Sequence, residues 1–315
     1  MRPRFTIRCA GIAFLFSALS LTAASDDFPL KHTPLFTYVV DYEAAWSPDG
    51  RQIVLISSRH GGMKVHIMDT LSESHGSDMK QITSGADEDD SPPWSPDGRK
   101  IAFVSIRNST SHIFVMNADG SEVRQLTSGP GDNIHPMWSP DGTRILFNTT
   151  HFAHGNLAGE ENTVENRVIG ERRDDSMDLA TVRSDGTHVQ RITSDGGFTY
   201  ASYSPDGRFI LHRRQQGETS QIFVMNADGS NDHNLSGRST LDGWPAWSPD
   251  GGRIVFSRRV ETGFQLFVMN RDGSAVRQLT DATGEFVNPR WSPDGSKILC
   301  GRRLGSISLV ILPAP

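Results

Sequence analysis

Cysteine is almost absent from this chain. Of 315 residues only Cys9 and Cys300 are cysteines, and Cys9 lies within an apolar N-terminal run. If that run is removed, Cys300 has no partner in the same chain, which excludes an intramolecular disulfide. An exported domain of this kind must then be stabilised by the packing of its apolar side chains, without the disulfides common in such proteins.

Signatures of catalysis and an excess of basic residues are lacking as well. The sequence contains no G-x-S-x-G, no H-E-x-x-H and no phosphate-binding glycine loop. Its formal net charge is −6, whereas proteins that bind nucleic acid present a basic surface to the phosphates. The composition therefore predicts a protein that does not bind nucleic acid and has no recognisable catalytic centre.

Only one long hydrophobic run is present, and it lies at the N-terminus. Residues 1–8 carry three arginines and no acidic residue, and the apolar run CAGIAFLFSALSLTAA follows at 9–24. A basic start, a short apolar run and a small-residue exit are typical of a secretory signal peptide, and the run is shorter than the about 20 residues of a membrane span. We predict a cleaved signal peptide over 1–24, a mature domain over 25–315 without a transmembrane segment, and a periplasmic or secreted location.

The tetrapeptide Ser-Pro-Asp-Gly divides the rest of the chain into units. It occurs six times, and its prolines follow one another at spacings of 48, 44, 65, 44 and 44 residues. An aromatic residue precedes each copy, at Trp46, Trp94, Trp138, Tyr203, Trp247 and Trp291. A repeat of about 40–45 residues is typical of the blades of a β-propeller.

Each unit contains the turns and apolar runs of a small sheet. In the Ser-Pro-Asp-Gly turn, proline sets φ for one central position and glycine takes the conformation that disfavours a side chain. Apolar runs such as KIAF and IFVM alternate with this turn and with a second one, Asn-Ala-Asp-Gly, which indicates antiparallel strands. The sequence predicts an all-β fold, a six-bladed β-propeller of four-stranded antiparallel blades with the recurring aromatic residue packed between blades.

The last unit has no run that could form its outermost strand. The segment Pro34–Thr37 precedes the first recurring aromatic residue at the place of an outer strand. We predict that this N-terminal strand completes the last blade, so that both ends of the propeller share one sheet and an open sheet edge is covered.

These motifs resemble the repeats of TolB-type propellers. The Trp-Ser-Pro-Asp-Gly turns, the Asn-Ala-Asp-Gly turns and the Arg-Gln-Leu-Thr runs carry the resemblance, which covers residues 33–315. It implies a six-bladed propeller of the periplasm or the cell exterior. TolB itself has an N-terminal α/β domain before its propeller, and no such segment precedes the first repeat here. Similar propellers occur in oligogalacturonate lyases, which use a histidine-bound metal at the channel mouth.

Turns and loops differ in how much they vary from unit to unit. The two turn motifs lie on one face of a propeller and hardly change along this chain. The remaining loops lie on the opposite face and diverge, and the spacing of 65 adds an insertion there at about 150–176. Because divergent loops on a rigid scaffold carry binding residues, we predict that this variable-loop face and the channel mouth bind a protein or peptide of the cell envelope. The insertion is either a partner-binding loop or a tolerated surface insertion.

Arginines end most of the predicted second strands, at Arg59, Arg107, Arg213-Arg214, Arg258-Arg259 and Arg302-Arg303. Acidic residues lie in the neighbouring loops, at Asp89, Asp90, Asp132, Asp195, Asp242 and Glu285. One hypothesis is a ring of cations that binds carboxylates or an anionic glycan through bidentate bonds. The other, which we favour, is a set of Arg–Asp pairs that tie the blades together. The arginines stay candidate contacts for the partner.

Three histidines, His135, His151 and His154, are candidates for the channel mouth. We assign them to partner binding, with a metal site as the alternative, because three imidazoles can hold a divalent ion. On that alternative the chain is a metal-assisted lyase or hydrolase that acts on an acidic oligosaccharide. The histidine spacing matches no tight ligand motif, so our prediction includes no cofactor.

Tyr200 and Trp244 complete the candidate residues. We predict that they precede the innermost strands, where an aromatic ring anchors a peptide or packs beneath a loop. The acidic run Asp87–Asp90 is expected to be a solvated loop rather than a calcium site. Taken together, the sequence predicts an exported, non-catalytic scaffold.

Overall fold

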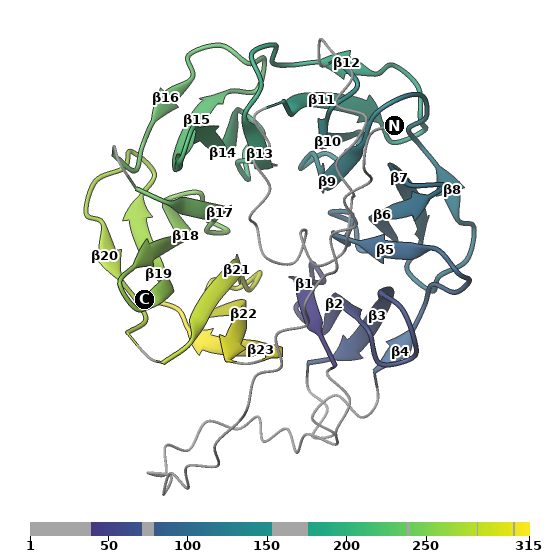
Figure 1. Cartoon of the computed structure of the whole chain (residues 1–315), viewed down its shortest axis with the longest axis horizontal. Helices are drawn as coiled ribbons and strands as arrows, with labels where there is room; N and C mark the ends of the chain where they lie inside the picture. The colour runs from purple at the N-terminus through teal and green to yellow at the C-terminus, as the bar shows by residue number, and fades with distance from the viewer. Residues whose placement is uncertain (1–38, 71–78, 153–175, 238–239, 282, 305) are drawn as a thin grey trace, which may run out of the picture. The chain divides into compact units, whose positions relative to one another are not determined.

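The structure, a computed structural model, describes residues 39–70, 79–152, 176–237, 240–281, 283–304 and 306–315. These residues form six antiparallel sheets. Figure 1 shows the sheets arranged radially about a central axis in the order of the chain. The predicted all-β, six-bladed propeller is confirmed. No helix within the described ranges is long and apolar enough to cross a membrane.

Each sheet is one blade, and its strands follow one another outward from the axis (Figure 1). The first three blades are β1 (Asp41–Trp46), β2 (Gln52–Ser57), β3 (Lys64–Asp69) and β4 (Lys80–Gln81); β5 (Glu88–Asp90), β6 (Lys100–Arg107), β7 (Thr110–Asn117) and β8 (Arg124–Gln125); and β9 (Asn133–Trp138), β10 (Arg144–Thr149), β11 (Asp178–Arg183) and β12 (Gln190–Arg191). The last three are β13 (Phe198–Tyr203), β14 (Phe209–Gln216), β15 (Thr219–Asn226) and β16 (His233–Asn234); β17 (Asp242–Trp247), β18 (Arg253–Val260), β19 (Gly263–Asn270) and β20 (Arg277–Gln278); and β21 (Glu285–Trp291), β22 (Lys297–Leu304) and β23 (Ser306–Pro313).

The Ser-Pro-Asp-Gly turns form a continuous ring on one face. In the first turn the Ser47 hydroxyl donates to Asp49 Oδ1 at 2.6 Å, and Gly50 has a φ of 71°, which disfavours any residue with a Cβ. A Cβ on Gly50 would lie 3.8 Å from Cδ of Pro293, in the turn of the last blade. The other five turn glycines face the proline of the preceding blade in the same way. These uniform turns are therefore part of the scaffold.

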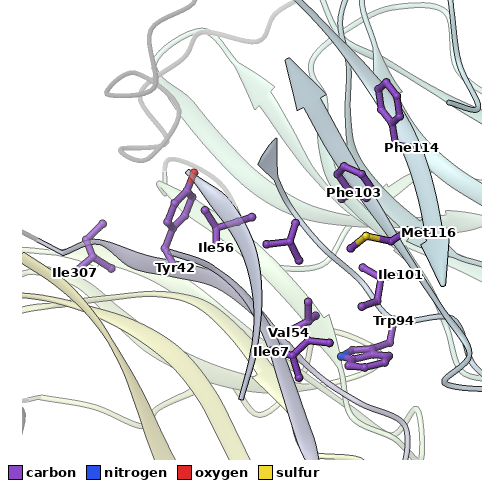
Figure 2. Packing of buried hydrophobic residues seen from close by; sticks show 11 residues of the cluster. Tyr42, Val54, Ile56, Ile67, Trp94, Ile101, Phe103, Phe114, Met116 and Ile307 are labelled. Carbon is purple, nitrogen blue, oxygen red and sulfur yellow. The ribbon is translucent and has the colours of Figure 1, made fainter. Parts of the chain in front are cut away.

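The recurring aromatic residues fill the space between blades, as predicted. Trp94, at the inner end of the second blade, packs with Val54 and Ile67 of the first blade and Ile101 of its own. Figure 2 shows these side chains together. Five further apolar clusters occupy the other interfaces, each with its own recurring aromatic residue. Burying a large apolar side chain contributes about 1.5–3 kcal/mol, so these clusters dominate the stability of the ring.

The ring is closed by the same kind of packing. Ile53 and Leu55 of the first blade contact Leu299 of the last, with Trp46, Leu309 and Ile311 packed around them. The Asn288 side-chain amide on β21 donates to the Glu43 carboxylate on β1 at 2.9 Å. The first and last blades are thus joined without a covalent link.

The structure tests one further sequence prediction, for the acidic run, and leaves three others open. The acidic run was predicted wrongly: Glu88–Asp90 is the innermost strand β5, and Asp89 is buried 3.6 Å from Lys64 Nζ. The insertion at about 150–176 joins β10 to β11, but 153–175 lie outside the described residues. So do the predicted signal peptide and Pro34–Thr37, and the strand closure by the latter stays a prediction. Among the residues described, the last blade has three strands.

A hydrogen bond shared by the five four-stranded blades makes that closure testable. In each, the hydroxyl of a Thr or Ser just after the outer strand accepts the backbone N–H of a third-strand residue at 2.8–3.0 Å, as Thr83 does from Val65. Val65 pairs with Ile56 of the second strand. Leu309 pairs with Gly301, the corresponding residue of the last blade. Thr37 is therefore the predicted acceptor for the Leu309 amide.

We expect Thr37→Val to lower the free energy of unfolding by about 1–3 kcal/mol, because a buried amide loses its acceptor. Thr83→Val, which removes a bond that the structure contains, is the matched control and should cost a similar amount. Denaturant unfolding measures both. An unchanged stability of Thr37→Val, together with fast hydrogen exchange at the Leu309 amide, would contradict the closure.

Candidate functional site

A β-bulge in the innermost strands determines what faces the central channel. The pairing between β1 and β2 shifts register between Tyr42 and Ala45, and the residue at the shift, Glu43, has a φ of 50°. The corresponding residue of every blade has a φ of 48–53°, although none is glycine. Such left-handed residues are strained and tend to occur at functional sites, and a bulge re-aims a side chain relative to the sheet.

These six residues form what we call the channel ring: Glu43, Ser91, His135, Tyr200, Trp244 and Asn288. All but Trp244 line a central cavity of about 310 Å³. Each lies three residues before the recurring aromatic residue of its blade. The innermost strands run from the variable-loop face toward the Ser-Pro-Asp-Gly face, and the channel ring therefore lies on the side of the cavity nearer the variable loops.

Three consecutive blades contribute aromatic members, which we call the aromatic arc. The rings of His135 and Tyr200 lie 4.2 Å apart between centroids, and those of Tyr200 and Trp244 lie 5.7 Å apart. Trp244 is only 4% exposed and packs edge-on against Phe264 at 5.3 Å. It therefore supports Tyr200 from behind, while His135 and Tyr200 present their rings to the cavity.

The other three blades contribute the polar arc, Asn288, Glu43 and Ser91. Asn288 donates to the Glu43 carboxylate at 2.9 Å. Its own side-chain oxygen is buried and accepts no hydrogen bond from the described residues. Asp90 precedes Ser91 in the chain, and its carboxylate accepts the Ser91 N–H at 2.7 Å. The channel ring is thus divided into an aromatic half and a half rich in hydrogen-bond acceptors.

A second layer lies deeper along the channel and consists of the residues just before the recurring aromatics: Ala45, Pro93, Met137, Ser202, Ala246 and Arg290. All six line the cavity. Five are small or apolar, and Arg290 is the one charged member. Its guanidinium donates to the carbonyl of Pro289 at 3.1 Å, and no ion pair joins it to Glu43 in the described structure.

Electrostatics set the protonation of Glu43. Burial and, after it, the nearby Asp90 carboxylate raise the pKa of Glu43 from 4.5 to about 7, against the opposing effects of Arg290 and of the Asn288 hydrogen bond. Burial also lowers the pKa of Arg290, an effect that the Glu43 charge partly offsets.

The predicted arginines lie outside the cavity and have mostly structural contacts. Ion pairs join Arg59 to Asp41, Arg258 to Asp242 and Arg303 to Glu285 at 2.7–2.9 Å. Both partners of each pair belong to one blade: Arg258 and Arg303 face their partners across the first two strands, and Arg59 follows β2. The expectation that Arg–Asp pairs tie blades together is therefore wrong for these three pairs.

The remaining arginines differ from one another. Arg107 lies 3.3 Å from Asp87 and over the ring of Phe114. Arg214 pairs with Asp232 at 2.9 Å and with Asp195. Asp195 lies between the third and fourth blades, so this pair does join two blades. Arg259 is exposed and lies over Phe264, 5.6 Å from the ring centroid.

The histidines are dispersed. His135 lines the cavity and packs against Tyr200, with the two rings tilted by 31°. His151 is exposed, forms a hydrogen bond of 2.8 Å with the Pro130 carbonyl and packs against Phe152. His154 lies outside the described residues. Within the part of the chain that the structure describes, no group of three or more His, Cys, Asp or Glu side chains could hold a metal ion.

The sequence identified only half of the channel ring. His135, Tyr200 and Trp244 were named, but Tyr200 and Trp244 were expected to precede the innermost strands and instead lie within β13 and β17. Glu43, Ser91 and Asn288 were missed. Their position in the repeat would have identified them, because every residue of the channel ring lies three residues before the recurring aromatic residue.

Comparisons with known proteins agree with this architecture. Residues 37–169 match the family of the TolB beta propeller domain. The chain is a six-bladed β-propeller similar to the TolB propeller domain. No curated protein matches its sequence.

Solved structures show the same TolB-like fold. A protein described as a TolB from Agrobacterium tumefaciens is 22% identical, with a TM-score of 0.65 over 89% of this chain and 92% of that one. TolB from Acinetobacter baumannii is 23% identical, with a TM-score of 0.63 over 88% of this chain and 61% of its own length. An oligogalacturonate lyase in complex with manganese is 12% identical, with a TM-score of 0.60 over 88% of this chain and 90% of that one. At these identities the likeness establishes the fold alone.

The raised pKa of Glu43 predicts a specific pH dependence. Unfolded Glu43 ionises near pH 4.5 and folded Glu43 near pH 7, so the native state binds more protons between these values and this residue makes stability fall as the pH rises. We expect Glu43→Gln to remove up to about 3 kcal/mol of the loss between pH 5 and pH 8. Glu261→Gln, at an exposed position, is the control, and denaturant unfolding measures all three proteins. Identical profiles for the two variants would refute the assignment.

Proposed function

We propose that this chain is an exported, non-catalytic β-propeller scaffold that binds a protein or peptide partner of the cell envelope at its variable-loop face and channel mouth. The observation that carries the proposal is the division of the channel ring into an aromatic arc and a polar arc. Aromatic anchors with a few fixed polar groups are typical of recognition surfaces. The resemblance to TolB-type propellers supports the envelope location.

The opposite face, formed by the Ser-Pro-Asp-Gly turns, differs little from blade to blade and so offers a partner few distinguishing residues. Its six turns have the same sequence and the same internal hydrogen bonds, Ser Oγ to Asp Oδ1 at 2.5–2.7 Å. These bonds lower the pKa of each turn aspartate, for example that of Asp294 to about 2. The turn carboxylates are therefore charged, and each accepts hydrogen bonds from its own turn. A partner that recognises residues that differ between blades must therefore bind at the variable-loop face.

Two exposed arginines provide a matched test. Arg259 lies over Phe264 on the variable-loop face, and Arg271 lies over Phe209 on the turn face, with 5.6 Å and 5.2 Å from guanidinium to ring centroid. We expect Arg259→Glu and Tyr200→Ala each to reduce partner capture at least tenfold, because a contact at an interface centre contributes about 2 kcal/mol or more. Arg271→Glu should leave it unchanged.

Capture is measured by crosslinking the purified protein in envelope extracts and quantifying the bound proteins. If Arg259→Glu and Tyr200→Ala capture the same proteins as the parent chain in the same amounts, the assignment of the face is wrong. If only Arg271→Glu loses capture, binding belongs to the turn face.

A metal-assisted lyase or hydrolase that acts on an acidic oligosaccharide is the second candidate. It is supported by His135 on the wall of the cavity and by the fold shared with a manganese-bound lyase. Elemental analysis of the purified protein separates the two functions. A stoichiometric divalent metal that is lost on His151→Ala would favour the lyase, and a metal-free protein would favour the scaffold.

A further inference from the structure

The first blade carries a histidine in its apolar core. His66 lies in β3, pairs with Leu55 of β2 and is fully buried. The corresponding third-strand residues of the other blades are apolar: Phe114, Ala180, Phe223, Phe267 and Val310. A buried histidine at an otherwise apolar position needs specific polar contacts for its ring nitrogens.

The two ring nitrogens of His66 have different partners. Nδ1 lies 2.9 Å from the backbone carbonyl of Lys64, and because a carbonyl only accepts, Nδ1 carries the proton. Nε2 of the neutral ring is therefore an acceptor, and it lies 3.0 Å from Nδ1 of His60. His60 is exposed in the loop between β2 and β3, on the variable-loop face. A carbonyl that fixes the tautomer of a histidine is a common outer partner of metal ligands.

The two histidine rings are aligned end to end. Their planes differ by 17°, and their centroids are 5.3 Å apart, which is about the largest separation possible for rings whose nitrogens are 3.0 Å apart. The two nitrogens therefore point at each other along one line. A tetrahedral or square-planar ion needs ligands that converge at an angle, so this pair cannot chelate one without turning. A linear arrangement instead suits monovalent closed-shell ions such as Cu⁺ and Ag⁺.

We propose that His60 Nδ1 and His66 Nε2 together bind one Cu⁺ ion in linear two-coordination, at a site separate from the channel. The ion takes the place of the proton between the two nitrogens, and His60 carries its proton on Nε2 instead, so no net proton is lost. Imidazole is a suitable ligand for copper. A linear site also needs no third side chain, whereas the described residues hold no metal-binding group of three.

The loop that carries His60 leaves room for the ion. Two metal–nitrogen bonds of about 2 Å each require the nitrogens to lie about 1 Å farther apart than in the hydrogen-bonded pair. Gly61 and Gly62 follow His60, and a Cβ on either would meet no atom within 4 Å, so this part of the loop is not packed against its surroundings. His60 can therefore withdraw while His66 stays fixed in the sheet.

Electrostatics keep the Nε2 lone pair of His66 available. Burial, above all, lowers the pKa of His66, against the opposing effect of its bond to the Lys64 carbonyl. Among the nearby charges, Arg59 disfavours a positive charge on His66 and Asp41 favours it. Arg59 pairs with Asp41 at 2.7 Å, and the other carboxylate oxygen of Asp41 is buried without a hydrogen-bond partner among the described residues. The arginine is thus matched, and a monovalent ion adds a single charge near a carboxylate.

The experiment titrates the purified chain with silver nitrate in a chloride-free buffer near neutral pH, because Ag⁺ shares the linear preference of Cu⁺ and keeps its oxidation state. Nitrogen NMR of a chain labelled with ¹⁵N-histidine reports which rings bind. We expect one Ag⁺ to shift Nδ1 of His60 and Nε2 of His66 together. These rings should also bind Ag⁺ at least about tenfold more tightly than Zn²⁺, which prefers another geometry.

Two variants remove one ligand each. His66→Phe introduces the residue that three other blades carry at this position, and His60→Ala alters an exposed side chain, so thermal unfolding should show both to be folded. Each should weaken Ag⁺ binding at this site by at least about 100-fold, because losing a ligand costs more than losing an outer partner. His233→Ala is the matched control and should change nothing. His233 is exposed and bonds a backbone carbonyl at 2.8 Å, but it has no histidine partner in the described part of the chain.

Three results would overturn the inference. No shift at either ring, or a shift at His60 alone, would leave the pair as a hydrogen bond only. Equal binding by the parent chain and His60→Ala would place the ion elsewhere, for example at the free thiol of Cys300. Tighter binding of Zn²⁺ than of Ag⁺ at these rings would exclude the linear geometry. Neither the capture test at Arg259 and Tyr200 nor a divalent metal lost on His151→Ala involves this pair, so the proposals fail separately.

Discussion

The packing of one aromatic side chain between each pair of blades is the constraint on which the rest of this structure depends. No blade buries both of its faces alone, and the chain has no disulfide among its described residues to join them. Trp46, Trp94 and their equivalents supply the apolar surface that lets neighbouring sheets meet. The channel exists only because all six interfaces form, including the one between the first and last blades.

That closing interface links residues far apart in the sequence, and it coincides with the polar arc. Glu43 and Asn288 approach each other only when the first and last blades meet, with 245 residues between them along the chain. The apolar cluster around Leu55 and Leu299 lies beside them. The contacts that close the ring and the proposed recognition site therefore share a location, so substitutions at Glu43 have to be judged by stability as well as by binding.

Much of the fold could be predicted from the sequence, because repeated turns fix the strands between them. Proline and glycine in the Ser-Pro-Asp-Gly turn restrict the backbone locally, so the turn forms wherever the motif occurs. The residues of the candidate site were harder to predict from the sequence. The bulge at Glu43 depends on the register between two strands, and a one-residue shift re-aims a side chain without any mark in the motif itself. Asp89 and Asp90 were misassigned for a related reason: pairing with β6 overrode the preference of acidic residues for a loop.

The bulge has a further consequence for how such a channel can diversify. Glu, Ser, His, Tyr, Trp and Asn all occupy the same backbone conformation at this position, within five degrees of one another in φ. The strain is imposed by strand pairing and not by the identity of the side chain. The six positions therefore accept different side chains in one backbone conformation. Substitutions there can change which groups face the channel while the turns, the blade interfaces and the number of blades stay the same.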